Sequence, residues 1–378
     1  MSRSTSIFSL ALALACLMLV GCGESAKQAD EFRIQGHVTG LEGKKMSLEK
    51  LVGVSSQPIS EVEVGSDGSF SVTAKGEANA IFQLRVPDGG RMLLMPEFDD
   101  VTVEADADEM EAYRPQGSPK TQAIRDFNLG QYRLYLDFVS AETRLDGVDR
   151  TKDTATWREL EAVTDKAMMA YRDYLRIFCD TVKSPALRSL AALSLTPNGN
   201  YHYLKGITDR IRGESPGSPS VAALDQALQG EADRRIGVVA PVITGNDLDG
   251  KPFDLSSLRG SHVYLQFWAS YCEFSRSENA KLVQLAPEMA KRKIRVLMFS
   301  LDDHEDAWRE YLKAAGLDWA IHVRGLNGTA SAEVSQYLVK AIPANYLIDR
   351  DGVIRDLDIR ADELPAVLST LPEASPQP

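Results

Sequence analysis

Three patterns of apolar and polar positions follow one another along the chain. From Phe32 to about Glu104 the two kinds of residue alternate with a period of two, which is typical of half-buried strands. From about Pro119 to Gly230 the apolar residues recur at helical spacing instead. From Gly237 onward, short apolar runs typical of buried strands alternate with helical segments. The pattern predicts a multidomain α+β chain with a β-rich part, a helical part and an α/β part.

The β-rich part contains segments of alternating polarity at residues 32–38, 46–51, 59–64, 69–72 and 80–86. Between them, Asp67-Gly68 and Asp88-Gly89-Gly90 have the composition of tight hairpin turns. We expect an antiparallel β-sandwich or small barrel over residues 31–116. It contains no catalytic constellation.

The helical part, residues 117–235, is expected to form an insert of four or five helices. One apolar face includes Ile124, Phe127 and Tyr135, and a second runs from about residue 157 to 178. Ser184-Pro185 and Ser218-Pro219 predict two further helix starts, because serine caps a helix and proline fits its first turn. Helical spacing favours a core role for the aromatic residues over a ligand groove.

One stretch of the α/β part carries candidate chemistry. Residues 263–267 predict a buried strand, and a helical pattern follows, so Cys272 falls at the N-terminus of a helix. Free N–H groups and the helix dipole favour a thiolate at that position. Ser275 can hydrogen-bond the thiolate, whereas the charge of Glu273 opposes its formation. We therefore expect a reactive sulfur at Cys272.

The segment Trp268-Ala269-Ser270-Tyr271-Cys272-Glu273-Phe274-Ser275 resembles the Trp-Cys-x-x-Cys active site of thioredoxin-like proteins. The resemblance is greatest to the TlpA/ResA-type thiol-disulfide oxidoreductases of bacterial envelopes. Residues 237–241 and 249–251 resemble the entry segment of that family, residues 341–349 its cis-proline strand, and Asp351-Gly352 the turn of its final hairpin. The β-rich part resembles the small β-domain often found ahead of such domains in envelope lipoproteins.

This resemblance covers the last third of the chain and implies a thioredoxin-like α/β sandwich over residues 236–373. Pro343 would be the cis-proline that faces the sulfur, and its strand edge can pair with an extended partner segment. Glu278 lies near the motif, where ResA-like proteins also carry an acid. It would either help to transfer the proton of the thiol or be a solvated residue on the helix face. The residues expected to line the substrate side are Trp268, Tyr271, Glu273, Phe274 and Ile342.

The chain departs from the family at Ser275, which stands where the second cysteine belongs. An alcohol cannot release a mixed disulfide, so three hypotheses remain open. The first is exchange through Cys272 alone, with an external thiol resolving the mixed disulfide. The second is a redox-inactive thioredoxin-like module that binds proteins. The third is a one-cysteine peroxidase of the AhpC/TSA kind, although Ala269 and Leu265 stand where that family has its threonine and proline.

Residues 1–22 predict a targeting segment. Arg3 precedes an apolar run at residues 7–20, which is shorter than the roughly 20 residues of a membrane-spanning helix. Leu19-Val20-Gly21-Cys22 resembles a bacterial lipobox, which implies a lipid on Cys22 and a tether over residues 23–30. The alternative is an ordinary secretory signal. We expect a membrane-anchored lipoprotein of the bacterial envelope that faces the periplasm or the outer surface, with a disordered tail at residues 374–378.

The composition of the chain limits the classes of partner that it can bind. Hydrophobic residues make up 44% of the chain and charged residues 25%, as in folded soluble proteins. The net charge of −12 argues against nucleic acid. The expected partners are protein thiols and disulfides of the envelope, and the membrane through the lipid.

Cysteine usage limits the redox chemistry. Cys16 and Cys22 belong to the targeting segment, which leaves Cys179 and Cys272 as thiols. Cys179 ends a helical pattern, and it is either a small buried hydrophobe or a thiol that resolves a disulfide on Cys272. The acidic residues 302–306 are expected to cap a helix and not to bind a metal. We expect neither a metal nor a cofactor.

Overall fold

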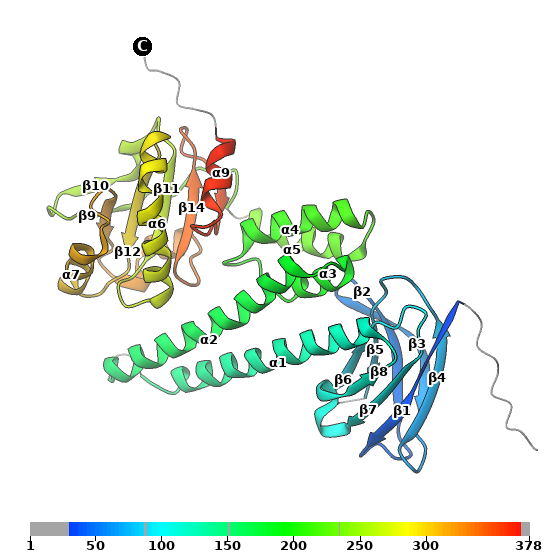
Figure 1. Cartoon of the computed structure of the whole chain (residues 1–378). Coiled ribbons are helices and arrows are strands. Elements are labelled where there is room, and N and C mark those ends of the chain that lie inside the picture. Colours follow the sequence, from blue (N-terminus) through cyan, green and yellow to red (C-terminus); the bar gives the residue numbers. More distant parts are fainter. Residues whose placement is uncertain (1–29, 87–88, 150–151, 234, 372–378) are drawn as a thin grey trace, which may run out of the picture.

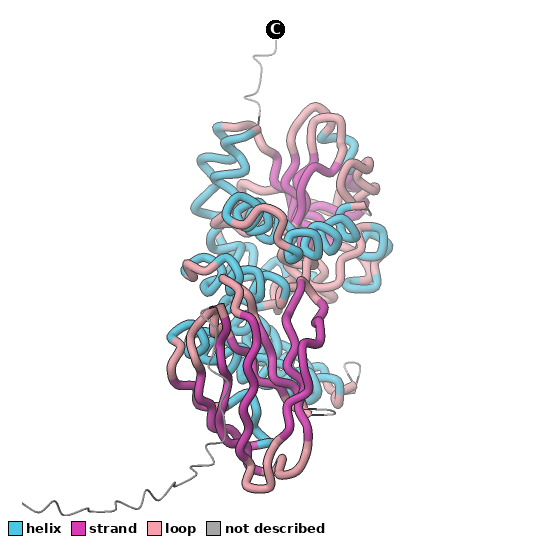
Figure 2. Tube along the Cα trace, turned by 90° about the vertical axis from the view of Figure 1, so that its right-hand side faces the viewer, coloured by secondary structure: helices cyan, strands magenta, loops and turns pink. Residues whose placement is uncertain are grey.

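The computed structural model describes residues 30–86, 89–149, 152–233 and 235–371. Within these ranges the chain forms two four-stranded sheets, then a group of helices, then a seven-stranded sheet with its own helices (Figure 1). The small sheets and the large sheet lie at opposite ends of the molecule with helices between them (Figure 2). The expected signal segment, the lipid site at Cys22, Asp88 of the second expected turn and the tail at 374–378 lie outside the described residues.

The first part contains strands that alternate inward and outward residues. They are β1 (Glu31–Thr39), β2 (Lys45–Val52), β3 (Ser55–Glu63), β4 (Ser69–Lys75), β5 (Phe82–Arg85), β6 (Arg91–Leu94), β7 (Val101–Asp106) and β8 (Arg114–Gln116). The two sheets have the orders β4-β1-β7-β8 and β3-β2-β5-β6. Phe32 and Ile34 from β1 and Leu48 and Leu84 from the other sheet share one buried cluster. The two sheets therefore enclose a common core.

Two expectations about this part are wrong in detail. β1 pairs antiparallel with β4 but parallel with β7, so the sheet is not purely antiparallel. Asp67-Gly68 does form a tight turn, in which the Gly68 N–H donates to Gly65, yet β3 and β4 on its two sides belong to different sheets. Alternating polarity identifies the buried face of a strand but not its partner, because pairing depends on residues far away in sequence.

The second part consists of α1 (Pro119–Asp146), α2 (Thr154–Thr181), α3 (Pro185–Leu193), α4 (Tyr201–Glu214) and α5 (Pro219–Ala232). The first two form a hairpin, each about 42 Å long at the usual rise per residue, that reaches toward the C-terminal domain (Figure 1). Phe127 stacks on Phe178 with ring centroids 4.0 Å apart. Further out Tyr135 is 47% exposed, so the apolar face predicted for α1 is buried at its inner end only. No described helix is both long and apolar enough to cross a lipid bilayer.

The third part is a mixed α/β domain with a thioredoxin-like order of elements. It contains β9 (Thr244–Asp247), β10 (Pro252–Asp254), β11 (Val263–Trp268), α6 (Glu273–Lys291), β12 (Arg295–Ser300), α7 (Glu305–Ala315), β13 (Ile321–Arg324), α8 (Ala332–Gln336), β14 (Ala344–Ile348), β15 (Ile354–Leu357) and α9 (Leu364–Thr370). The sheet order is β10-β9-β13-β12-β11-β14-β15, with β11 parallel to β12 and antiparallel to β14. All six residues of β11 are buried, which explains why its sequence is apolar except at Gln266. The Gln266 side chain donates a hydrogen bond to the Asn279 side chain of α6 at 2.7 Å.

The two faces of this sheet have different neighbours. Tyr264 and Trp268 belong to a cluster with Leu282 of α6, Trp308 of α7 and Leu364 of α9. The opposite face of the sheet packs in one continuous cluster with the helices of the second part. Consecutive residues of β11 therefore face either the helices of their own domain or the helical part.

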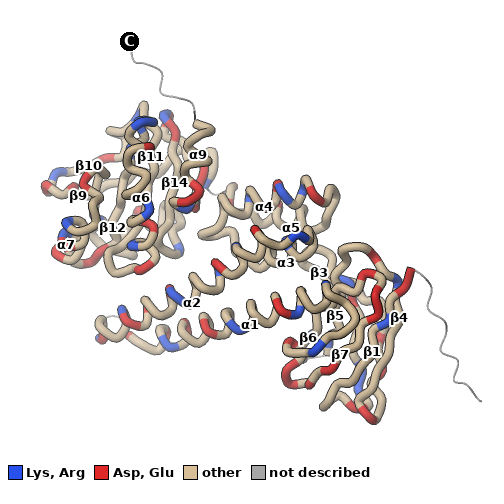
Figure 3. The backbone as a smooth tube through the Cα atoms, viewed as in Figure 1, with Lys and Arg blue, Asp and Glu red and all other residues tan. Residues whose placement is uncertain are grey.

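Lys and Arg are interspersed with Asp and Glu along each part of the chain (Figure 3). This arrangement differs from the clustered cations that bind a phosphate backbone.

Candidate active site

Cys272 lies between a central strand and the helix that follows it. β11 ends at Trp268, and Cys272 is the residue that caps the N-terminus of α6. The side chain of Cys272 is only 3% exposed. The sulfur therefore sits at the predicted helix tip, but it is covered.

The ladder between β11 and β14 places the proline segment next to the sulfur. Phe267 pairs with Ala344, so the residues just before β14 reach the turn that contains Cys272. The Ile342-Pro343 peptide bond is cis, and the Cys272 Sγ lies 3.5 Å from the carbonyl oxygen of Ile342. The structure thus brings together two segments that the sequence separates.

Asp302 holds the turn that precedes the sulfur. Its carboxylate accepts hydrogen bonds from the Ser270 amide at 3.0 Å, the Ser270 hydroxyl at 2.6 Å and the Ser300 hydroxyl at 2.7 Å. The expected helix-capping role is wrong for this residue, since the capping position of α7 is His304. A signal was available: Asp302 follows β12, and the carboxyl ends of parallel neighbours such as β11 and β12 meet at one edge of the sheet.

Ser275 is completely buried on the first turn of α6. Its hydroxyl accepts a hydrogen bond from the Ala269 amide at 3.4 Å. The Ser275 amide and hydroxyl also lower the pKa of the Cys272 thiol, which is the effect expected from the sequence. Burial and the charge of Asp165 raise the pKa of Cys272 by more than Ser275 lowers it.

Asp165 of α2 is a part of the site that the sequence did not reveal. The Cys272 Sγ lies 3.4 Å from the Asp165 Oδ2, so the thiol has two oxygen acceptors, this carboxylate and the Ile342 carbonyl. Burial, and next the charge of Asp165, raise the pKa of Cys272 from 9.0 to about 12. The expectation of a reactive thiolate is wrong for this conformation, because loss of solvation outweighs the favourable helix terminus.

The other residues expected around the sulfur divide between the two faces of the sheet. Trp268 packs on Tyr311, with ring centroids 5.2 Å apart, in the cluster that excludes Cys272, so it does not line the thiol. Tyr271 and Phe274 do lie on the Cys272 side of the sheet. Two arginines of α2 cover their rings, Arg158 at 6.0 Å from the Tyr271 centroid and Arg172 at 4.7 Å from the Phe274 centroid.

The two acidic residues of α6 have structural partners. Glu273 is exposed and forms an ion pair with Arg276. Glu278 accepts a hydrogen bond from the Ala361 amide at 2.8 Å and pairs with Lys281 at 2.8 Å. Its carboxylate is therefore neither simply solvated nor held against the sulfur, and it ties α6 to the segment before α9.

Cys179 is not placed to resolve a disulfide on Cys272. Both cysteines are free thiols. Asp165, which contacts Cys272, and Cys179 lie on the same helix, fourteen residues apart (165 to 179), which corresponds to about 21 Å along its axis. Cys179 is fully buried near the carbonyl oxygen of Arg188, and burial raises its pKa to about 12. The interpretation of Cys179 as a small buried hydrophobe fits these contacts.

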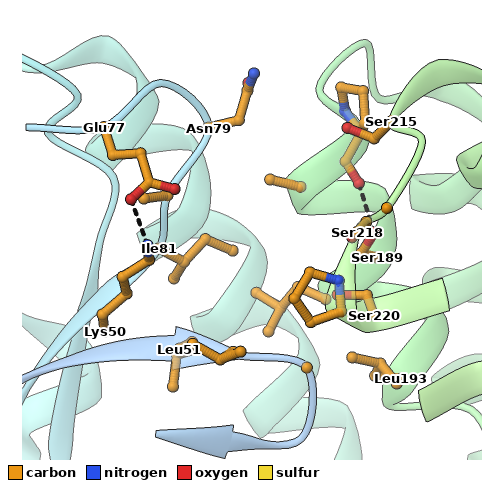
Figure 4. A pocket seen from close by; sticks show the side chains of 18 of the residues that line it. Lys50, Leu51, Glu77, Asn79, Ile81, Ser189, Leu193, Ser215, Ser218 and Ser220 are labelled. Carbon is orange, nitrogen blue, oxygen red and sulfur yellow. Dashed lines mark hydrogen bonds and ion pairs between the residues drawn. The ribbon is translucent and has the colours of Figure 1, made fainter. Parts of the chain in front are cut away.

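A separate cavity of about 450 Å³ lies between the β-sheets and the helical part (Figure 4). Its lining includes the side chains of Leu51, Ile81, Ser189 and Leu193. Lys50 and Glu77 on the wall of this cavity form an ion pair with each other. Among the described residues, no group of three His, Cys, Asp or Glu side chains could hold a metal ion. The candidate chemistry is thus at Cys272.

Comparisons with known proteins concern the same domain. Residues 236–357 match the AhpC/TSA family. The thiol-disulfide oxidoreductase ResA of Bacillus cereus is 28% identical over 120 residues, which are 32% of this chain and 67% of that protein. The thiol:disulfide interchange protein DsbE of Vibrio cholerae is 28% identical over 122 residues, 32% of this chain and 62% of that protein. A solved thiol-disulfide oxidoreductase from Bacteroides fragilis shares 30% identity over 35% of this chain and 98% of its own, with a TM-score of 0.33.

The C-terminal domain is therefore a thioredoxin-like domain related to the AhpC/TSA family and to thiol-disulfide oxidoreductases of the ResA and DsbE kind. The family match begins at residue 236, so it concerns this domain alone.

Proposed function

We propose that this protein performs thiol-disulfide exchange with other proteins through Cys272 as its single reactive thiol. The observation that carries the proposal is the placement of Cys272 at the start of α6, beside the carbonyl of Ile342 and the cis Ile342-Pro343 bond. Ser275 occupies the place of a second thiol, and Cys179 lies about 21 Å along α2 from Asp165, the residue of that helix that contacts Cys272. The related proteins named above act on thiols and disulfides, which supports the same chemistry here.

The exchange has two balanced steps. The Cys272 thiol first gives up its proton, and the thiolate attacks one sulfur of a partner disulfide. A new S–S bond forms, the old one breaks, and the departing partner sulfur takes up a proton. An external thiol then attacks the mixed disulfide, so that Cys272 is regenerated as a thiol and the partner leaves bonded to the external thiol. Ser275 cannot perform the second step because its alcohol is not a nucleophile toward sulfur at neutral pH.

The proposed setting is the bacterial cell envelope. Residues 1–22 have the pattern of a lipoprotein signal, so Cys22 would be lipid-modified and would tether the protein to a membrane. Its partners would be envelope proteins that carry thiols or disulfides, and an extended partner segment could pair with the backbone next to Pro343.

A second candidate function is a redox-inactive module that holds other proteins. The observation in its favour is that Cys272 is buried and that its raised pKa disfavours the thiolate. A peroxidase would need the thiolate as much as the exchange reaction does, so this burial gives that third hypothesis no support.

The test is to incubate the reduced protein with a peptide disulfide and to map any adduct by mass spectrometry. We expect one peptide per chain on Cys272, none in C272S, and an unchanged yield in C179S, the matched control. If the folded chain forms no adduct, even when helix α2 is loosened as described below, while the unfolded chain does, the binding-module hypothesis replaces this proposal.

A further inference from the structure

One face of α2 is matched to the active-site turn. Three of its side chains, spaced seven residues apart, contact three residues around the sulfur: Arg158 the ring of Tyr271, Asp165 the Sγ of Cys272, and Arg172 the ring of Phe274. Residues seven apart lie on the same side of a helix. The contact is therefore made by a continuous strip of α2.

Ion pairs hold the same helix to the C-terminal domain further along. Asp173 pairs with Arg360 at 2.9 Å, and Arg176 pairs with Glu363 at 3.0 Å. The Asp173 side chain is 37% exposed, so solvent reaches the first of these pairs. The Arg360 side chain is 18% exposed, so the pair lies at the edge of the contact, where water can compete for the Asp173 carboxylate.

The closed arrangement also has a cost. The Nε atoms of Arg172 and Arg176 are buried without a hydrogen-bond partner among the described residues. A buried donor left unpaired destabilises the arrangement that buries it, because the donor has lost its hydrogen bond to water. Arg172 lies over Phe274 of the C-terminal domain, so moving α2 away would return its guanidinium to water, and the closed state is opposed by this buried group.

The charged groups that face the sulfur keep it protonated. From α2 come the carboxylate of Asp165 and, next to it, the guanidinium of Arg172. From α6 come Glu273 and Arg276, which neutralise each other. The Ile342 carbonyl faces the sulfur from the third side. Among these, Asp165 is the anion in contact with the thiol, and an acceptor of that kind favours S–H over S⁻.

We propose that α2 is a reversible cover of the thiol site, and that Asp165 is the residue through which the closed cover holds Cys272 as an unreactive thiol. When this segment of α2 moves away, Cys272 gains solvent and loses the anion, while Ser275 and the helix N-terminus remain to favour the thiolate. The proposal rests on the exchange function proposed above and states how that site is regulated.

The test is the rate at which iodoacetamide labels Cys272 in the full chain, measured peptide by peptide at mildly alkaline pH. D173R places two arginines opposite each other at the exposed pair and should speed labelling at least about tenfold, which equals one unit of pKa. The double variant D173R/R360D restores the pair with reversed charges and should return the rate to that of the wild type. D165N removes the anion but keeps the shape, and it should also speed labelling about tenfold.

Cys179 reports on folding in the same digest, because it lies at the other end of α2 and packs against Arg188 of α3, within the helical part. It should stay slow in every variant. If D173R labels Cys272 at the wild-type rate, the cover does not exist; if D165N does so, Asp165 does not control the thiol. If D173R also speeds the labelling of Cys179, D173R has disturbed the fold, and the test rests on D173R/R360D and D165N. Labelling of Cys272 in D173R/R360D that is faster than in the wild type then overturns the proposal.

This measurement needs no disulfide exchange. Accelerated labelling of D173R without any peptide adduct would sustain the cover and overturn the proposed function. Adduct formation at equal rates in the wild type and D173R would sustain the proposed exchange function and overturn the cover.

Discussion

Replacing Ser275 by cysteine should give the site the thiol that it lacks. Residues three apart on a helix are neighbours on its surface, so a cysteine at position 275 would lie beside Cys272, within reach of a disulfide. Ser275 is completely buried and accepts a hydrogen bond from Ala269. Loss of that bond costs about 1 kcal/mol, and the larger sulfur in a filled site costs about 1–3 kcal/mol. The free energy of unfolding of reduced S275C should therefore be about 2–4 kcal/mol lower than that of the wild type.

The redox consequence is read by mass spectrometry after mild oxidation. S275C should lose two hydrogen atoms and yield one peptide that links residues 272 and 275. S277C is the matched control, because it adds a thiol to the same helix at a position about 140° round the axis from Cys272. If S275C oxidises no more readily than S277C, Cys272 does not lie on the first turn of α6 and the geometry described here is wrong.

Three further outcomes are expected. C179A should leave the yield of peptide adduct unchanged, because Cys179 lies about 21 Å along α2 from Asp165, which contacts Cys272. D302A should lower the free energy of unfolding in urea by about 3 kcal/mol, because the Ser270 amide loses its acceptor; an effect below about 0.5 kcal/mol would exclude a structural role. Burial raises the pKa of Asp358, which accepts from the Gly199 amide, from 3.8 to about 6. The stability from this group is therefore present below its unfolded pKa and lost as pH rises through the folded value, by up to about 3 kcal/mol; D358N should remove that fall, and equal urea midpoints against pH for both proteins would contradict it.

Much of the C-terminal domain could be predicted because its signals are local. The run at residues 263–267 is apolar at every position but Gln266, since β11 is buried on both faces. The polar turn after it ends at Cys272, where α6 begins. Ser184 and Pro185 likewise predicted the start of α3, where the serine hydroxyl accepts from the Leu187 amide.

The predictions that were wrong concern features that depend on residues far away in the sequence. A strand buried on both faces shows no alternation, so its pattern cannot tell that Phe267 shares the Cys272 side while Trp268 faces the other core. Asp165 looks like an ordinary polar position of a long helix, and it is separated from Cys272 by 107 residues. The argument for a thiolate considered only the helix end, and it omitted the desolvation that α2 imposes.

The central claim, a single thiol that cannot release its partner unaided, is tested most directly by the release rate of the purified mixed disulfide. The peptide adduct on Cys272 is isolated, and the freed peptide is followed against the concentration of added glutathione. We expect a straight line through zero, because each release needs one external thiol. Measurable release at zero glutathione, from the wild type and C179S alike, would contradict the single-thiol mechanism.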